Sequence, residues 1–165
     1  MGLFDKLKTF AGMHGCSVEM TSLEKQNISD VTFPLTDSVF KGNYNVNAKS
    51  DCTILAHIHE VVVEVKKDDI IETTVIASDK HDEKTEIIGT DLKWPYDLGA
   101  GQSKSDGFCI TDVDIPAVLK KLGFSNPQAA INSKEVNFFV KVTADVKGTP
   151  LDSECKVPFR VVNIL

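Results

Sequence analysis

Long hydrophobic runs are missing from this sequence of 165 residues. No stretch approaches the roughly 18 to 20 apolar residues that a membrane-spanning helix needs. The start of the chain also lacks a basic region followed by the roughly 7 to 15 apolar residues of a secretory signal peptide. We therefore expect a cytoplasmic protein.

Positive charge is also in short supply. The chain has 18 Lys and Arg against 24 Asp and Glu, a formal net charge of −6. Nucleic-acid binding depends on clustered Lys and Arg that neutralise phosphates, and the basic residues here are dispersed. The composition therefore argues against a nucleic-acid partner.

Motifs of catalysis and cofactor binding are absent from the sequence. It contains no GxSxG, no HExxH, no phosphate-binding GxxxxGK[ST] and no CxxC pair. The four cysteines lie far apart, and in a cytosolic protein we expect reduced, mostly buried thiols; in a secreted chain two disulfides would be the alternative. We expect a protein that is not an enzyme and has no cofactor.

The last quarter of the chain has the clearest pattern. From Val136 to Val146 every second residue is apolar, with polar residues and Phe139 between them, and the same alternation returns from Cys155 to Val161. A period of two is typical of a strand with one buried face. Residues 147–150, Lys-Gly-Thr-Pro, supply the turn, so this region predicts a long antiparallel hairpin.

Similar alternation predicts further strands earlier in the chain. In 51–67 the apolar phase changes midway, which predicts a β-bulge near His59 and Glu60. We expect 70–78 to pair with 85–92, the turn-rich segment 94–107 to be a crossover loop, and short helices to follow Asp114 and Asn126. The remaining strand predictions cover 16–22, 28–33, 38–48 and 108–113. The pattern predicts an all-β, two-sheet antiparallel β-sandwich of immunoglobulin-like type in one domain, 16–165.

Residues 1–15 predict a short amphipathic helix ahead of this domain. Its apolar side chains recur at helical spacing and lie at Leu3, Phe4, Leu7 and Phe10. A helix this short usually needs packing, so we expect it to cover an open end of the sandwich. The alternative is weak contact with a membrane surface or with a partner.

His57 and His59 are the sharpest metal candidates. Their i, i+2 spacing on a strand places both imidazoles on one face, which can hold zinc, and His81 offers a third ligand from a predicted loop. Two exposed histidines on the solvent face of a strand are the commoner arrangement. We therefore predict no metal site and keep the three histidines as candidates.

Several segments together resemble the sporulation-control protein family of the arrestin clan. The opening MGLFDKLK leads through Gly12 to a first strand, 40–48 forms a strand around Gly42, Trp94-Pro95-Tyr96-Asp97 is similar to the proline-aspartate step of an arrestin-like crossover, and 140–161 is similar to the hairpin that ends an arrestin half. The resemblance implies an arrestin-like sandwich and no catalytic residues. This chain has room for about one sandwich, so a groove between two halves would require a homodimer.

The resemblance implies an adaptor or regulatory module that binds a protein partner. We expect recognition through an exposed sheet edge, or through the concave face and the 94–107 loop, with Trp94, Tyr96 and Phe139 as contacts because aromatic residues anchor interfaces. Two alternatives remain: a peripheral membrane protein held by the N-terminal helix, and a metal-dependent enzyme that uses His57 and His59.

Overall fold

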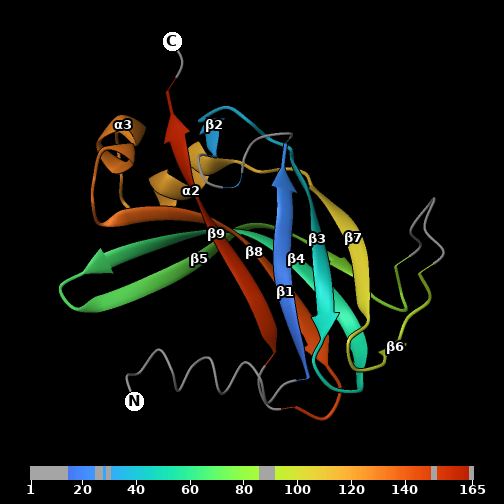
Figure 1. Ribbon diagram of the computed structural model, residues 1–165. Coiled ribbons are helices and arrows are strands. Elements are labelled where there is room, and N and C mark those ends of the chain that lie inside the picture. The colour runs from blue at the N-terminus through green and yellow to red at the C-terminus, as the bar shows by residue number, and fades with distance from the viewer. Residues whose placement is uncertain (1–14, 25–27, 29–30, 86–91, 150–151, 164–165) are drawn as a thin grey trace.

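The computed structural model describes residues 15–24, 28, 31–85, 92–149 and 152–163, which form two β-sheets (Figure 1). The smaller sheet has the strand order β1-β3-β7, and the larger has the order β2-β9-β8-β4-β5, with β6 paired to β4. The strands are β1 (Cys16–Leu23), β2 (Thr32–Pro34), β3 (Phe40–Ala48), β4 (Cys52–Lys67), β5 (Ile70–His81), β6 (Tyr96–Leu98), β7 (Ser103–Ile110), β8 (Val136–Val146) and β9 (Ser153–Val162). This arrangement confirms an all-β, two-sheet, sandwich-like fold.

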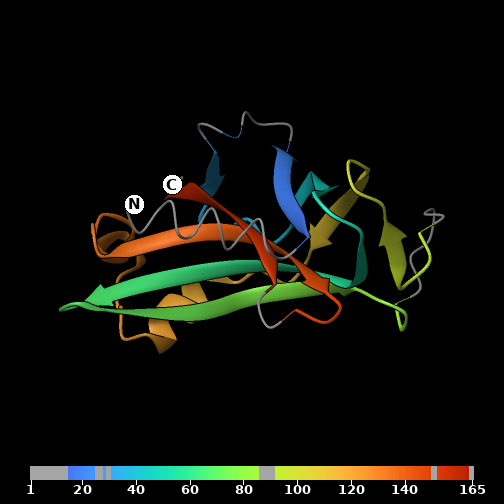
Figure 2. The same cartoon turned by 60° about the horizontal axis from the view of Figure 1, so that its bottom comes forward.

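The two sheets form layers that enclose the core. Figure 2 shows β1 and β3 stacked on one side of the long strands β4, β5 and β8. The pairs are antiparallel except for β2 with β9, which run parallel. The expectation of a fully antiparallel sandwich is therefore wrong at this edge, where β2 is a strand of three residues that ends at Pro34.

The predicted C-terminal hairpin is confirmed. β8 and β9 pair in antiparallel register, with Phe138 opposite Phe159 and Val142 opposite Cys155. The even residues of β8 from Val136 to Val146 are buried, and Val157, Phe159 and Val161 of β9 are buried on the same side. One face of this hairpin therefore belongs to the core.

The phase change in β4 lies earlier than predicted. The register of β4 against β8 shifts between Ile54 and Ala56, where Leu55 is the extra residue, and continues unbroken through His59 and Glu60. After this bulge the odd residues face the core, so His57 and His59 share a face with the buried Val61. The predicted bulge at His59 and Glu60 is wrong, and so is the expectation of solvent-exposed histidines.

β5 also differs from the prediction. It extends to His81, and its ladder within the described residues is with β4, from His57 opposite His81 to Lys67 opposite Ile70. The predicted partner strand 85–92 lies mostly outside the described residues. The predicted loop 94–107 contains β6 and the first half of β7, so it is only partly a loop.

Two short helices follow β7, as the sequence predicts. α2 (Ile115–Lys121) begins after Asp114, whose carboxylate accepts a hydrogen bond from the backbone N–H of Ala117 at 3.0 Å. α3 (Pro127–Ile131) begins after Asn126, whose side chain accepts from the N–H of Gln128. Both helices have a proline in the first turn, where its missing N–H costs no hydrogen bond.

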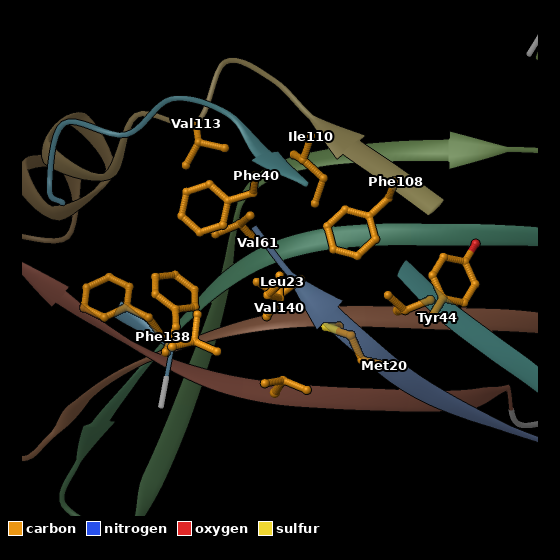
Figure 3. Close-up of a cluster of buried hydrophobic side chains, with 14 of the residues drawn as sticks. Met20, Leu23, Phe40, Tyr44, Val61, Phe108, Ile110, Val113, Phe138 and Val140 are labelled. Atoms are coloured by element: carbon orange, nitrogen blue, oxygen red, sulfur yellow. The ribbon is translucent and has the colours of Figure 1, made fainter. Parts of the chain in front are cut away.

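The apolar core fills the space between the sheets (Figure 3). Phe33, Phe40 and Phe159 pack ring against ring, with centroids 4.1 Å apart for Phe33 and Phe40 and 5.2 Å for Phe40 and Phe159. Tyr44 lies at the end of this cluster, and its hydroxyl oxygen points away from the neighbouring apolar side chains. A polar region therefore begins where the apolar core ends.

The predicted N-terminal helix, including Leu3, Phe4, Leu7 and Phe10, lies outside the described residues. Within the described residues, no helix is both long enough and apolar enough to span a membrane. The cysteines are free thiols, of which Cys16 is buried, Cys52 and Cys155 are half-buried and Cys109 is exposed. The expectation of mostly buried thiols is therefore wrong for Cys109.

Candidate functional site

A cluster of hydrogen-bonding side chains lies between the two sheets, next to the apolar core. Its members come from both layers: Tyr44 on β3, His57 and His59 on β4, Asp79 and His81 on β5, and Asp106 on β7. Tyr44, His57 and His59 have no exposed surface, and the side chain of Asp106 is 6% exposed. Such a buried polar group is stable only when its members pair with one another.

Strand register explains how the cluster forms. The bulge at Leu55 turns His57 and His59 inward, and the antiparallel pairing of β4 with β5 places His81 opposite His57 and Asp79 opposite His59. On the other sheet, Tyr44 pairs directly with Asp106. The larger sheet thus contributes two cross-strand pairs, His57 with His81 and His59 with Asp79. They face the pair of Tyr44 and Asp106 on the smaller sheet.

The Tyr44 hydroxyl is the centre of the first half of the cluster. It lies 2.6 Å from Nδ1 of His57 and 2.7 Å from Nε2 of His59, and it donates to Oδ2 of Asp106 at 3.0 Å. One phenol oxygen therefore links both histidines of β4 to the carboxylate of Asp106 on β7.

Asp106 joins the two halves of the cluster. Its Oδ2 also lies 2.9 Å from Nδ1 of His57 and 3.1 Å from Nδ1 of His81, and its Oδ1 accepts from the backbone N–H of Gly107 at 2.8 Å. Burial opposes its charge, but the hydrogen bonds from His57, His81 and Gly107 hold the pKa of Asp106 well below its usual range. The cluster thus contains a buried negative charge.

Asp79 and His81 form the second half, with His59 shared between both. Oδ2 of Asp79 lies 3.3 Å from Nδ1 of His59 and 3.3 Å from Nε2 of His81. The side chain of Asp79 is 32% exposed and that of His81 is 11% exposed. This half therefore opens toward solvent, whereas the half around Tyr44 is closed.

The histidines differ in their pKa values. Burial, together with the nearby charge of His81, lowers the pKa of His59 to about 4, and burial also lowers the pKa of His57. Burial disfavours charge on His81 as well, but hydrogen bonds and charges from Asp106 and Asp79 outweigh it and raise the pKa of His81. The folded protein therefore favours the neutral form of His57 and His59 and the protonated form of His81.

Trp94 and Tyr96, predicted as partner contacts, cover this cluster. The Tyr96 hydroxyl lies 2.6 Å from Nε2 of His57, and the Trp94 ring packs edge-on to His57 with centroids 4.6 Å apart. Nε1 of Trp94 is buried without a hydrogen-bond partner among the described residues. Both aromatic residues are half-buried, so part of each remains at the surface.

Phe139 belongs to a different surface, the outer face of the larger sheet. Strand register places Pro158, Phe139, Val62 and Val75 in one row across β9, β8, β4 and β5. Val62 is buried, Phe139 is half-buried beneath the Lys156 ammonium group, and Val75 at the sheet edge is 47% exposed. We call these four residues the outer apolar row.

The β5 strand that ends this row is itself rich in exposed apolar residues. Ile70 and Ile71 are 66% and 59% exposed. They follow the turn from β4, which projects at the left of Figure 1. Ile71 and Val75 lie on the same face of the strand because they are four residues apart. The free side of β5 therefore combines exposed apolar side chains with backbone groups that pair with no described strand.

Sequence reasoning found the three histidines but missed Tyr44, Asp79 and Asp106. The alternation of 38–48 places Tyr44 on the apolar, inward face of its strand. A buried tyrosine hydroxyl needs a hydrogen-bond partner, so this position was the available sign that polar residues lie nearby. Asp79 and His81 were assigned to a loop, and Asp106 to a turn-rich segment, so nothing placed them opposite the histidine pair.

Two sets of these residues could hold a metal ion. One comprises His57, His59 and Asp106, and the other comprises His59, Asp79 and His81. The cluster consists of imidazole, phenol and carboxylate groups, which can form hydrogen bonds and bind a metal ion.

Comparison with known proteins gives a likeness of fold. No protein-family model matches the sequence, and no curated protein matches it. Among solved structures, the fold is similar to that of Spo0M, a sporulation control protein from Bacillus subtilis, with a TM-score of 0.55 and 17% sequence identity. The match covers 89% of this chain and 49% of the Spo0M chain, so the chain spans about half the length of that protein. At this identity the likeness establishes the two-sheet fold that it shares with a sporulation control protein.

Proposed function

We propose that this protein is a non-enzymatic regulatory or adaptor module that binds an extended segment of a partner protein along the free edge of β5. The observation that carries the proposal is the exposure of Ile70, Ile71 and Val75 on β5, which is an edge strand among the strands that the structure describes. Natural proteins usually protect such edges with charge, proline or a covering element, because an exposed apolar edge readily pairs with another strand. An edge that keeps three large apolar residues exposed is therefore suited to strand addition.

The outer apolar row supplies the side-chain part of this site. An added strand would use the backbone of β5 for hydrogen bonds, while its side chains on the outer face meet Val75, behind which Val62 and Phe139 continue the row across the sheet. Backbone pairing gives affinity, and the exposed Ile71 and Val75 on one face of β5 give selectivity for apolar residues on the same face of the partner strand. The similarity of fold to a sporulation control protein supports a regulatory role.

Affinity capture with a matched pair of variants tests the proposal. The full chain, Val75→Lys and Val39→Lys are each immobilised and exposed to lysate of the cells that produce the protein. Val39 is a matched control because it is 38% exposed and lies outside the β5 edge. We expect a discrete partner to be retained by the unmodified chain and by Val39→Lys, and to fall at least tenfold with Val75→Lys.

Equal capture by all three proteins would contradict the β5 site, and so would loss of the partner with Val39→Lys alone. If the partner is lost only when residues 1–13 are deleted, recognition lies in the predicted N-terminal helix instead. Binding to anionic vesicles that disappears when Leu3, Phe4, Leu7 and Phe10 are changed to Ser would favour the peripheral membrane alternative over the adaptor.

A further inference from the structure

Three residues in the open half of the polar cluster, His59, Asp79 and His81, have ligand atoms within 4.8 Å of one another. Oδ2 of Asp79 lies 3.3 Å from Nδ1 of His59 and 3.3 Å from Nε2 of His81. Tetrahedral zinc holds nitrogen and oxygen ligands at roughly 2.0–2.2 Å, which separates neighbouring ligand atoms by about 3.3 Å. Both distances from Asp79 therefore match those between neighbouring ligands of a zinc ion.

The strands hold the three ligands in place. His59 and Asp79 are directly opposed across the antiparallel β4–β5 ladder, and His81 follows Asp79 by two residues on the same face of β5. Residues on paired strands are positioned more rigidly than residues on loops. The partial exposure of Asp79 leaves a fourth position open to water or to an exogenous ligand.

The groups behind the ligands are those that zinc sites use. A histidine that binds zinc through one ring nitrogen usually donates its other N–H to a carboxylate, hydroxyl or carbonyl oxygen, which fixes the ring. Here Nδ1 of His81 lies 3.1 Å from Oδ2 of Asp106, and Nε2 of His59 lies 2.7 Å from the Tyr44 hydroxyl. The Tyr44 hydroxyl in turn donates to Asp106, so both ligand histidines are oriented by one buried carboxylate.

The other candidate set, His57, His59 and Asp106, does not suit an ion. The Tyr44 hydroxyl already lies among its ligand atoms, 2.6 Å from Nδ1 of His57, 2.7 Å from Nε2 of His59 and 3.0 Å from Oδ2 of Asp106. An ion at the centre of that set would have to displace the phenol oxygen. His57 therefore supports the cluster without being a ligand.

We propose that His59, Asp79 and His81 bind a single zinc-class divalent transition metal ion, with Tyr44 and Asp106 positioning the two histidines. Two imidazoles and one carboxylate favour zinc over calcium or magnesium, which prefer all-oxygen sites. The ion would take the place of the hydrogen bonds that both histidines share with Asp79. Asp79 and His81 lie at the C-terminal end of β5, away from Ile70, Ile71 and Val75, so the metal proposal does not rest on partner binding at that edge.

Metal titration of the full chain tests the site. Protein made without a histidine tag is treated with a chelator and dialysed, and zinc alone is then added and followed by calorimetry, with cobalt absorption reporting the coordination geometry. We expect one zinc ion per chain and the visible bands of four-coordinate cobalt. Asp79→Asn, at the part-exposed position, should lose the site, whereas His57→Gln should keep its stoichiometry.

A second ligand variant protects the test against misfolding. His81→Gln should also lose the ion, and circular dichroism shows whether each variant keeps its β-structure. Asp106→Asn should weaken binding about 10- to 100-fold without abolishing it, as other outer ligand-orienting groups do. Sub-stoichiometric zinc in the unmodified chain would overturn the proposal. Unchanged binding by a folded Asp79→Asn, or loss of binding with a folded His57→Gln, would overturn it too.

Discussion

Tyr44 shows how one hydroxyl can hold a buried polar cluster together. Its ring belongs to the apolar core (Figure 3), while its oxygen contacts two histidines of β4 and a carboxylate of β7. Burial and the charge of Asp106 raise the pKa of Tyr44, so the phenol remains protonated and can donate. The hydroxyl therefore stabilises groups that would otherwise be buried without a partner.

Tyr44→Phe keeps the ring and removes only this oxygen. Nε2 of His59 then loses its contact in a site without exposed surface, which we expect to lower the free energy of unfolding by about 1–3 kcal/mol. Urea denaturation measures the change. Tyr96→Phe is the control: the residue is half-buried and its hydroxyl bonds to His57 alone among the described residues, so the loss should be smaller. Equal stability of Tyr44→Phe and the unmodified protein would contradict this account.

His59 makes a specific contribution to the pH dependence of stability. Its pKa is about 4 in the folded protein, against about 6.5 in an unfolded chain, so the unfolded state binds more protons between these values. The free energy of unfolding should therefore fall as the pH drops from about 6.5 to about 4, by an amount on the order of 3 kcal/mol for this group alone. The pKa of His81 is raised, so His81 has the opposite effect on stability. Its stabilising contribution to the free energy of unfolding is complete below about pH 6.5 and is lost as the pH rises through its folded pKa.

Urea denaturation in the presence of a chelator, at several pH values across this window, measures the slope. The groups that face His59 are Tyr44 on β3, His57 on β4, Asp79 and His81 on β5, and Asp106 through Tyr44. We expect His59→Asn to lose less stability than the unmodified protein as the pH falls. Parallel pH profiles for the two proteins would show that His59 does not titrate as described.

At the scale of single elements, β3 depends on a close approach at Gly42. A Cβ at this position would lie 2.6 Å from Cζ of Phe108 and 2.6 Å from the backbone oxygen of Ser22. The backbone of β1 cannot move without disturbing the ladder that joins Leu23 to Gly42. We expect Gly42→Ala to lower the free energy of unfolding by about 1–3 kcal/mol, as overpacking in a core does.

Gly107→Ala is the matched control on the neighbouring strand. Its Cβ would lie 3.0 Å from Oδ1 of the Asn43 side chain and 3.3 Å from the Gly42 oxygen, so a side-chain movement relieves the tighter contact. Its destabilisation, measured by the same urea denaturation, should be the smaller of the two. A larger effect for Gly107→Ala would mean that the β1–β3–β7 sheet is not as tightly packed at Gly42 as described.

Local sequence pattern predicted the elements where the alternation is regular. The β8–β9 hairpin and the two capped helices were found because period, turn and cap residues lie within short segments. The bulge at Leu55 was misplaced because Ile54, Ala56 and Ile58 form an alternating pattern that continues past the actual shift. That error of a few residues turned His57 and His59 to the wrong face, since a change of one residue in a strand exchanges its two faces.

At the scale of the whole molecule, the polar cluster needs contacts that no local pattern contains. Tyr44 and Asp106 are 62 residues apart in the sequence and meet only because β3 and β7 pair on the smaller sheet. The two-sheet fold was predictable from the number and spacing of strands. The cluster was not, because it depends on which strands face one another across the core.

A bound zinc ion should stabilise the whole molecule, because it binds the folded state. At a free concentration about 100 times its dissociation constant, it adds about 2.7 kcal/mol to the free energy of unfolding. For a domain of this size the melting temperature should rise by about 5–10 °C. Asp79→Asn should show no such rise when measured by differential scanning calorimetry. An equal rise in that variant would place the stabilising ion elsewhere.

The central claim, that a partner adds a strand to the free edge of β5, is tested most directly by hydrogen–deuterium exchange. The partner captured by the unmodified chain is added back, and exchange is compared with and without it. We predict slower exchange for the β5 amides that point away from β4, with little change in the exposed start of β7 at Ser103, Lys104 and Ser105. Unchanged exchange in β5, together with protection at another part of the surface, would contradict the account.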